Sequence, residues 1–252
     1  MAHSDAPYAA GKAAARAAAN GGVPASGRDP SEPSNPPRES SSDPSTTPAV
    51  PETPQAGVER IILDDRAIRR ALMRIAHEIV ERTEAPERLY LIAIPNGGVP
   101  LGRILVDNLE SLIDQRVPLG ILDTTLYRDD LSIRGSRPRL RRTEMPSSVD
   151  DRVVVLVEDV VNTGRTIRAA MDALMDFGRP SEVRVVSLVD RGHRELPIKI
   201  DHVGKNIPTQ STDKVIFRRA DLASSAEGGT GEEILGGADA ELELVVRGGA
   251  GS

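Results

Sequence analysis

The sequence predicts an α/β domain whose central sheet is mostly parallel and flanked by helices. Apolar strands alternate with amphipathic helices between residues 58 and 219, and this alternation is typical of parallel sheets. One predicted strand, residues 153–157, consists of five successive aliphatic residues, four of them β-branched. Such a run suits a strand that is covered on both faces. The two ends of the chain differ in composition and are predicted to lie outside the domain.

The two ends of the chain lack the apolar residues of a folded core. The first 57 residues contain 10 of the 19 prolines and no Ile, Leu, Phe or Trp, so residues 1–57 are predicted to be a disordered Pro-, Ala- and Ser-rich extension. Residues 220–252 are Gly-rich and acidic and are predicted to be a mostly disordered tail. Its apolar run, residues 242–246, is the one place there where a short strand is an alternative. A single domain, residues 58–219, remains.

The formal net charge of −6 conceals an asymmetry along the chain. Residues 58–219 contain 27 Lys and Arg and 25 Asp and Glu, a net charge of +2, whereas the two ends contain 5 and 13, a net charge of −8. A mildly basic domain is compatible with a nucleic-acid partner. The sequence has no cysteine, which excludes disulfides, a thiol nucleophile and a Cys-ligated metal. No apolar run approaches the roughly 18 residues of a membrane span, so we expect a cytoplasmic protein without a membrane partner.

The first predicted elements are a helix and a strand–loop–helix unit. Four apolar residues at helical spacing predict a helix over residues 65–82: Ile68, Leu72, Ile75 and Ile79. A strand over residues 89–94 is followed by a Gly-pair loop, residues 96–98, and by a helix over residues 100–112. The backbone amides of such a loop can hold phosphate oxygens.

Two further strands each lead into a polar segment. A third strand is predicted over residues 117–126, and the long charged segment that follows, 127–142, is predicted to be a mobile lid or a binding arm. A fourth core strand is predicted over residues 183–189, and the polar loop 190–197 follows it. Both segments therefore lie at strand ends, where ligands bind to open α/β sheets.

The segment after residues 153–157 contains most of the candidate chemistry. Glu158 and Asp159 follow this strand directly and are placed to meet a ligand. Residues 163–166, Thr-Gly-Arg-Thr, offer two hydroxyls and several backbone amides at the start of a helix predicted over residues 167–177, where the helix dipole favours a phosphate. Acids for sugar hydroxyls beside amides for a phosphate predict a ribose 5-phosphate site. A buried strand with an ordinary capped helix is the alternative, but it does not explain the adjacent acids together with Thr-Gly-x-Thr.

This segment resembles the phosphoribosyl pyrophosphate (PRPP) motif of type I phosphoribosyltransferases, and it matches neither the Gly-x4-Gly-Lys loop nor the dinucleotide Gly-x-Gly-x-x-Gly pattern. Four more segments are similar to one subfamily, the PyrR regulators of pyrimidine operons. They are DDRAIRRALMRIAHE (64–78), TLYRDDL (125–131), LVDRGHRELP (188–197) and GKNIPT (204–209). The resemblance covers residues 58–219 and neither end of the chain.

The resemblance implies a type I phosphoribosyltransferase fold with a small hood and a flexible loop. It implies a uracil phosphoribosyltransferase that converts uracil and PRPP to UMP and diphosphate, with Mg²⁺ arriving on PRPP and no metal held by the protein alone. It also implies a UMP-responsive regulator that binds a stem-loop of a leader mRNA and attenuates transcription, and a homodimer or higher homo-oligomer.

The resemblance also assigns residues to these roles. Catalysis is assigned to Asp159, Glu158 and Arg128, and no nucleophile is nominated, because departure of pyrophosphate is assisted by Mg²⁺, amides and arginines. PRPP or UMP binding is assigned to Val155, Leu156, Val157, Glu158, Asp159, Val160, Val161, Asn162, Thr163, Gly164, Arg165, Thr166, Asn96, Gly97, Gly98 and Arg191. RNA binding is assigned to Arg70, Arg74, His77, Arg191, His193, Arg194 and Lys205.

Four positions, in three segments, depart from the usual pattern of this subfamily. Relatives often carry Thr-Arg where this chain has Asn96-Gly97, so one cation beside the leaving pyrophosphate is lost; Asn162 replaces a frequent aromatic residue, and Met73 a frequent Thr. Two alternatives stay open: a phosphoribosyltransferase for another base, such as orotate or a purine, and a nucleotide-sensing RNA regulator with little catalysis. An enzyme that has lost RNA regulation is a third.

Overall fold

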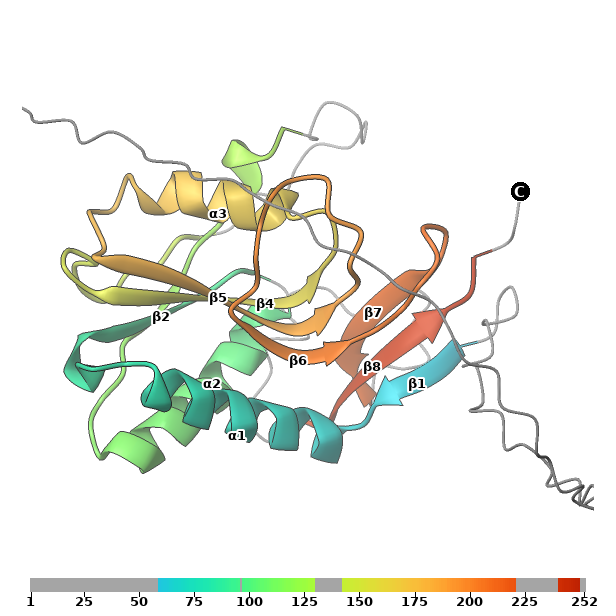
Figure 1. The fold of residues 1–252 in the computed structure, drawn as a ribbon, viewed down its shortest axis with the longest axis horizontal. Coiled ribbons are helices and arrows are strands. Elements are labelled where there is room, and N and C mark those ends of the chain that lie inside the picture. The colour runs from blue at the N-terminus through green and yellow to red at the C-terminus, as the bar shows by residue number, and fades with distance from the viewer. Residues whose placement is uncertain (1–58, 96, 130–141, 221–239, 250–252) are drawn as a thin grey trace, which may run out of the picture. The chain divides into compact units, whose positions relative to one another are not determined.

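The computed structural model describes residues 59–95, 97–129, 142–220 and 240–249. Its main sheet has five parallel strands in the order β3-β2-β4-β5-β6. Helices α1 and α2 cover one face of this sheet and α3 covers the other (Figure 1). The predicted α/β class, with a parallel sheet between helices, is therefore confirmed.

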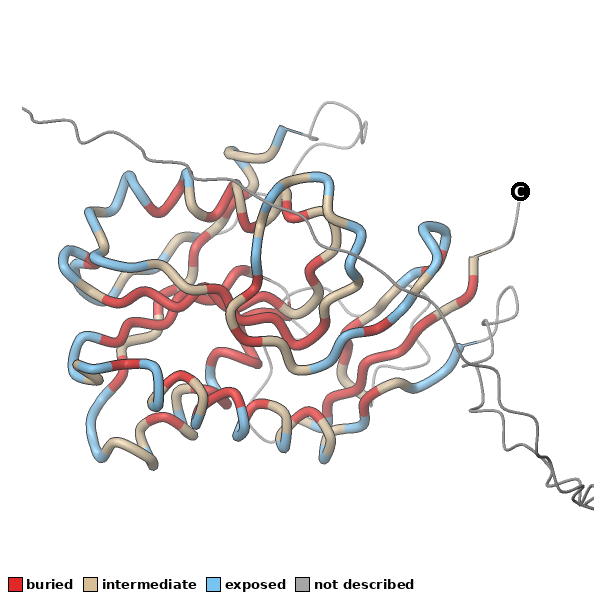
Figure 2. Tube along the Cα trace, in the orientation of Figure 1, coloured by how far each residue is buried: buried red, intermediate tan, exposed pale blue. Residues whose placement is uncertain are grey.

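The elements of this main layer have the following bounds. The strands are β2 (Leu89–Ala93), β3 (Leu119–Ile121), β4 (Val153–Val161), β5 (Glu182–Asp190) and β6 (His202–Asn206). The helices are α1 (Asp65–Glu81), α2 (Gly98–Ile113) and α3 (Arg165–Leu174), with short 3-10 turns η1 (Pro86–Arg88) and η2 (Thr125–Tyr127). Burial is concentrated in the strands of the main sheet (Figure 2).

Helix α1 forms where its apolar stripe predicts it. The side chain of Asp64 accepts a hydrogen bond from the backbone N–H of Ala67 at 2.7 Å and caps the first turn. The four stripe residues, Ile68, Leu72, Ile75 and Ile79, are completely buried in the core cluster that includes β2 and β4. This packing places the opposite, polar face of α1 on the surface.

Two predicted strands have different bounds in the structure. Strand β4 does not end at residue 157 but continues to Val161, because it stays paired with β5 as far as Asp190. The strand predicted over residues 117–126 is shorter: β3 covers only Leu119–Ile121, and the turn η2 follows it. Strand β6 was not predicted, because its sequence, HVGKN, contains a glycine and two exposed polar residues.

A second, smaller sheet contains a strand from the C-terminal end of the chain. It is antiparallel, in the order β1-β8-β7, with β1 (Glu59–Leu63), β7 (Lys214–Arg219) and β8 (Leu242–Arg247). The buried Arg218 donates to Glu243 at 2.7 Å and to Glu59 at 3.0 Å, so one guanidinium joins all three strands. The domain boundary predicted at residue 219 therefore leaves out a strand that lies in the middle of this sheet.

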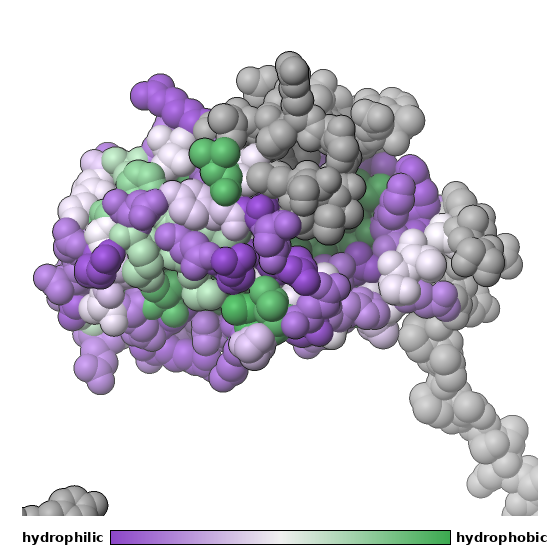
Figure 3. Space-filling model, turned by 90° about the horizontal axis from the view of Figure 1, so that it is seen from above, coloured by the Kyte–Doolittle hydropathy of each residue, from purple (hydrophilic) through white to green (hydrophobic). Residues whose placement is uncertain are grey.

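The disorder predicted for residues 1–57 and for most of 220–252, and the greater part of the predicted lid, lie outside the described residues. In the part of the chain that the structure describes, no helix is long and apolar enough to cross a membrane. The face that carries α3 is mainly hydrophilic with scattered apolar side chains (Figure 3).

Candidate active site

A cavity of about 360 Å³ opens where the predicted PRPP motif joins β4 to α3. It is lined by Arg128, Glu158, Val160, Val161, Asn162, Thr163, Gly164, Arg165, Thr166 and Glu195. Nine of these ten residues belong to the sequence-predicted site. The tenth, Glu195, was missed, although it is an acid in the polar loop that follows β5.

The backbone of the turn between β4 and α3 requires a glycine. Gly164 caps α3 with a φ of 91°, in the left-handed region that favours glycine. The carbonyl of Thr163 accepts hydrogen bonds from the amides of Glu195, at 3.0 Å, and Leu196, at 3.2 Å. The guanidinium of Arg194 donates to the carbonyl of Asn162 at 2.7 Å. The loop after β5 thus fixes the turn, and residues 163–166, which lead into α3, line the cavity, where a helix start favours an anion.

Glu158 is a buried carboxyl whose hydrogen-bonding capacity is only partly used. Its side chain is 7% exposed, and its Oε2 atom has no hydrogen-bond partner among the described residues. Burial, and then the charge of Asp159, raise its pKa from 4.5 to about 8, against the opposing effects of Thr166, Arg128 and Arg194. At neutral pH the ligand-free site therefore favours the protonated carboxyl, and Oε2 needs a partner that a ligand can supply.

Two arginines, Arg128 and Arg165, line the same cavity as Glu158. Arg128 donates to the hydroxyl of Thr166 at 3.0 Å. Arg165 forms ion pairs with Asp129 at 2.6 Å and with Glu195 at 2.8 Å. These contacts connect the first residues of the predicted lid, the PRPP turn and the loop after β5. They fix two guanidinium groups at the wall of the cavity.

Asp159 lies apart from the lining of this cavity. It is partly buried, and its side chain lies over Gly97, the residue that caps α2. Burial raises the pKa of its carboxyl. The predicted pyrophosphate loop, of which Gly97 and Gly98 are described and Asn96 is not, is therefore beside Asp159, and the two acids face different parts of the site.

Like Asp159, Gly97 and Gly98, four further predicted ligand-binding residues are not part of the cavity lining. Val155, Leu156 and Val157 are completely buried and pack into the core, because β4 continues beyond them. Arg191 turns toward the segment before β7 and donates to the hydroxyl of Thr209 at 3.1 Å and to the carbonyl of Asp213 at 2.9 Å. Their side chains therefore serve packing and loop structure in the ligand-free protein.

The candidate RNA-binding residues separate into two groups. Arg70 and His77 on α1 and Lys205 on β6 are exposed. Arg191 and Arg194 are held by contacts within the protein, and Nε2 of His193 lies 2.8 Å from the carbonyl oxygen of Thr209.

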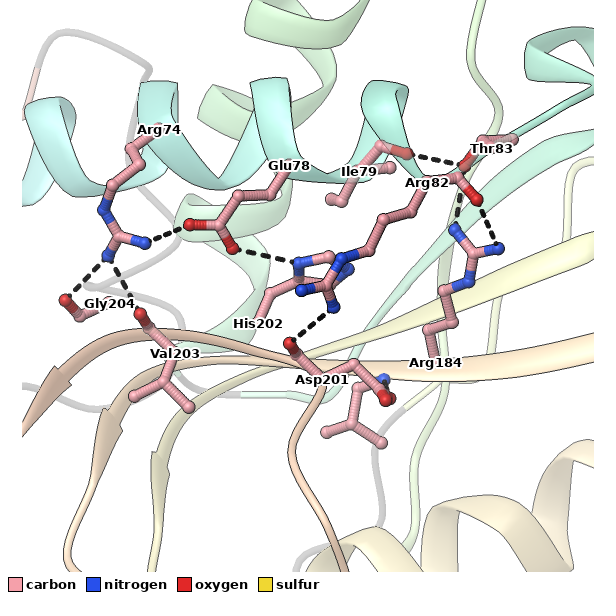
Figure 4. Close-up of polar contacts among 11 residues, drawn as sticks. Arg74, Glu78, Ile79, Arg82, Thr83, Arg184, Asp201, His202, Val203 and Gly204 are labelled. Carbon is pink, nitrogen blue, oxygen red and sulfur yellow. Dashed lines mark hydrogen bonds and ion pairs between the residues drawn. The ribbon is translucent and has the colours of Figure 1, made fainter.

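Arg74 belongs to the held group as well. Its guanidinium donates to the carbonyls of Val203 and Gly204, both at 2.9 Å, and forms an ion pair with Glu78. Glu78 also contacts Nδ1 of the buried His202 at 3.1 Å (Figure 4). Arg74 therefore joins α1 to β6, and the sequence could not show this because β6 was not predicted.

The comparison with known proteins agrees with this geometry. The family described as Phosphoribosyl transferase domain matches residues 60–223. The chain is 52% identical over 161 residues to the Bifunctional protein PyrR of Pelotomaculum thermopropionicum, a match that covers 64% of this chain and 89% of the relative. The chain belongs to the PyrR family of phosphoribosyltransferases. A second PyrR relative, from Deinococcus radiodurans, is 53% identical over 154 residues, which cover 61% of this chain and 84% of the relative.

Solved structures support the fold assigned to this PyrR-family chain. The crystal structure of a hypoxanthine-guanine phosphoribosyltransferase from Bacillus anthracis superimposes with a TM-score of 0.51 at 18% identity, covering 62% of this chain and 86% of the other. The predicted type I phosphoribosyltransferase fold is confirmed. The PyrR motifs also coincide with the site: four of the residues that line the cavity or pair with its rim, Arg128, Asp129, Arg194 and Glu195, lie in the segments TLYRDDL and LVDRGHRELP.

Proposed function

We propose that this PyrR-family protein transfers ribose 5-phosphate from PRPP to uracil, forming UMP and diphosphate, and that it regulates transcription by binding leader mRNA when UMP is bound. The observation that carries the enzymatic part is the cavity lined by Glu158 and residues 160–166, where an acid with an unused oxygen lies beside the start of helix α3. This pair of features matches the hydroxyl and phosphate ends of one ribose 5-phosphate.

Each end of the substrate has a matching set of groups. The 5-phosphate binds at residues 163–166, where backbone amides and the hydroxyls of Thr163 and Thr166 can donate. A ribose hydroxyl donates to the unused Oε2 of Glu158. Arg128, held by the hydroxyl of Thr166 at 3.0 Å, lies where it can oppose negative charge.

Asp159 also suits the metal that accompanies PRPP. Mg²⁺ usually keeps several waters and takes one or two protein carboxylates together with substrate oxygens, and Asp159 provides one carboxyl beside the predicted pyrophosphate loop. Bound with PRPP, Mg²⁺ neutralises charge on the leaving diphosphate. The residues of the chain hold the sugar and its phosphate, so that uracil meets C1 of the ribose in one orientation.

The first experiment measures UMP formation from uracil, PRPP and Mg²⁺, with Asp159→Asn as the matched control. We expect UMP from the wild type and a large loss in the variant. Orotate and hypoxanthine in place of uracil test the alternative bases. UMP binding without release of diphosphate would contradict the enzymatic part of the proposal and support the alternative of a nucleotide-sensing RNA regulator.

The regulatory part of the proposal concerns the exposed polar face of α1 and the adjacent β6. Four candidates are exposed there, Arg70, Arg74, His77 and Lys205. Of these, Arg74 is held by Glu78 and by two carbonyls of β6, which lies against α1 (Figure 1). Contacts from Arg and Lys to RNA phosphates give affinity, and exposed loop bases give specificity. Nascent mRNA and PRPP place this activity in the cytoplasm, and we expect a homodimer or higher homo-oligomer.

The RNA test compares binding of a leader stem-loop at several salt concentrations, with and without UMP. Replacing Lys205 or Arg70 by Gln should weaken binding, because each variant has one cation fewer for the RNA phosphates. The slope of log affinity against log salt should fall by about 0.7 to 1 for each phosphate that the variant no longer neutralises. Unchanged affinity and unchanged slope in both variants would show that this face of α1 and β6 does not bind the RNA.

A further inference from the structure

A buried histidine on β6 uses one ring nitrogen in a hydrogen bond and leaves the other without a partner. The side chain of His202 is completely buried, and its Nδ1 lies 3.1 Å from Oε2 of Glu78 on α1. Its Nε2 is buried and has no hydrogen-bond partner among the described residues. Burial raises the pKa of Glu78, but hydrogen bonds from His202 and Arg74 outweigh it and lower this pKa below 4.5. The ionised carboxylate can only accept, so Nδ1 carries the proton and donates it.

This hydrogen bond begins a chain of contacts that returns to β6. Glu78 also pairs with Arg74, one turn earlier on α1. Arg74 in turn donates to the carbonyls of Val203 and Gly204, both at 2.9 Å, and these are the two residues that directly follow His202 (Figure 4). We call these contacts of Arg74, Glu78 and His202 the α1–β6 clasp. Because its parts are adjacent in the chain, a movement of His202 also moves both acceptors of Arg74.

The charged groups around the ring favour the neutral histidine. Burial lowers the pKa of His202 below 6.5 and the charge of Arg82 lowers it further, whereas Glu78 and Asp201 raise it. On the side of β5, Arg184 donates to the carbonyl of Arg82 at 3.0 Å. The two acids therefore do not compensate for the loss of water around the ring.

A proton on Nε2 does not fit the clasp. It would create a buried N–H donor that has no acceptor among the described residues, and such a donor is strongly unfavourable. The ring can satisfy this donor only by leaving its pocket toward water, and residues 203 and 204 then move away from Arg74.

We propose that His202 makes the α1–β6 clasp sensitive to pH. The neutral ring fixes Glu78 and, through it, Arg74, whereas the protonated ring leaves its pocket and releases β6 from α1. The same two elements carry the face to which the proposed regulatory function assigns RNA binding. The consequence for RNA therefore rests on that function, whereas the clasp itself does not.

The test is hydrogen exchange, followed by mass spectrometry, of residues 201–206 in ligand-free protein at pH 7.5 and 5.5. Each rate is corrected for the intrinsic effect of pH on exchange. A released histidine titrates near 6.5, so protonation should increase the opening of the clasp by up to about tenfold at pH 5.5 and by almost nothing at pH 7.5. His202→Asn keeps an amide donor and cannot be protonated, so it should show no such increase.

Two controls separate the clasp from other effects. Residues 153–157 of β4, paired with β2 and β5, report global unfolding, so residues 201–206 should exchange faster than they do at pH 5.5. His77→Asn removes an exposed histidine of α1 and should leave the increase at its wild-type size. An equal increase in His202→Asn, or equal protection of the two segments in the wild type, would overturn the inference.

A second measurement repeats the exchange at pH 5.5 with the leader stem-loop and UMP bound. RNA that binds the clasped state should slow the exchange of residues 201–206. Bound RNA that leaves this exchange unchanged would overturn the link between the clasp and the RNA face. Absence of any RNA binding would contradict the regulatory part of the proposed function alone, because the effect of pH is measured without RNA.

Discussion

Replacing Glu158 by glutamine should stabilise the ligand-free protein, and the gain should grow with pH. Glu158 is 7% exposed, and its burial and the nearby Asp159 raise its pKa from 4.5 to about 8. Between these two values the folded protein binds a proton that the unfolded chain releases. The free energy of unfolding contributed by this group is therefore fully present below pH 4.5 and is lost as the pH rises to 8.

The magnitude follows from the two pKa values. A difference of one pH unit corresponds to about 1.4 kcal/mol, so moving from 4.5 to about 8 amounts to about 5 kcal/mol. Glutamine resembles the protonated carboxyl and cannot ionise. Glu158→Gln should therefore raise the free energy of unfolding by about 1 kcal/mol at pH 5, about 3 kcal/mol at pH 7 and about 5 kcal/mol at pH 9.

Urea unfolding of ligand-free protein, followed by circular dichroism at these three pH values, measures this difference. The exposed Glu241 supplies the control: Glu241→Gln should change the free energy of unfolding by less than about 0.5 kcal/mol throughout. PRPP binding should weaken in Glu158→Gln although the protein is more stable, as expected when a strained group serves function. A difference between Glu158→Gln and wild type that stays constant from pH 5 to pH 9 would refute the reasoning.

Three further predictions concern polar interactions outside the cavity. Arg74→Gln should lower the free energy of unfolding by about 0.5–1.5 kcal/mol, because hydrogen bonds from α1 to two carbonyls of β6 are lost at the surface. Arg70→Gln, at an exposed position of the same helix, should change it by less than about 0.5 kcal/mol in the same urea titration. Arg218→Met should lower the free energy of unfolding by about 3–5 kcal/mol, because it leaves the buried Glu243 unpaired. Adding Glu243→Gln should recover part of this loss in urea unfolding. No recovery would show that the unpaired acid is not the cause. Burial lowers the pKa of His202 below 6.5, so the unfolded chain takes up a proton there before the folded protein does, and the free energy of unfolding falls as the pH falls below 6.5. His202→Asn should reduce this loss between pH 7.5 and 5.5 in urea unfolding. An unchanged pH dependence would contradict this cause.

Much of the main layer could be predicted because its signals are local in the chain. The burial of α1 is predicted by the periodicity of its apolar residues, and the burial of β4 by its run of aliphatic residues. The turn at residues 163–166 was also predictable, since its glycine and hydroxyls act within a few residues of one another. Nine of the ten cavity residues follow from this one motif and from Arg128.

The sequence was least informative where a residue depends on a distant partner. The short run at 242–247 is a strand because β1 and β7 pair with both of its edges, and β1 is about 180 residues away along the chain. Glu195 was missed as a cavity residue because its place is set by Arg165 and by the carbonyl of Thr163. These interactions exist only once β4, α3 and the loop after β5 have assembled.

The sequence by itself determined the α/β class, the PRPP turn and the family, because each rests on residue types at short, regular spacing. Only the tertiary structure decided which polar groups face the cavity. It placed the arginines at 74 and 191 in contacts within the protein and put Asp159 over Gly97. The physical reason is that a long or charged side chain takes its partners from whatever backbone folding brings within hydrogen-bonding distance, and periodicity in the sequence contains no information about that distance.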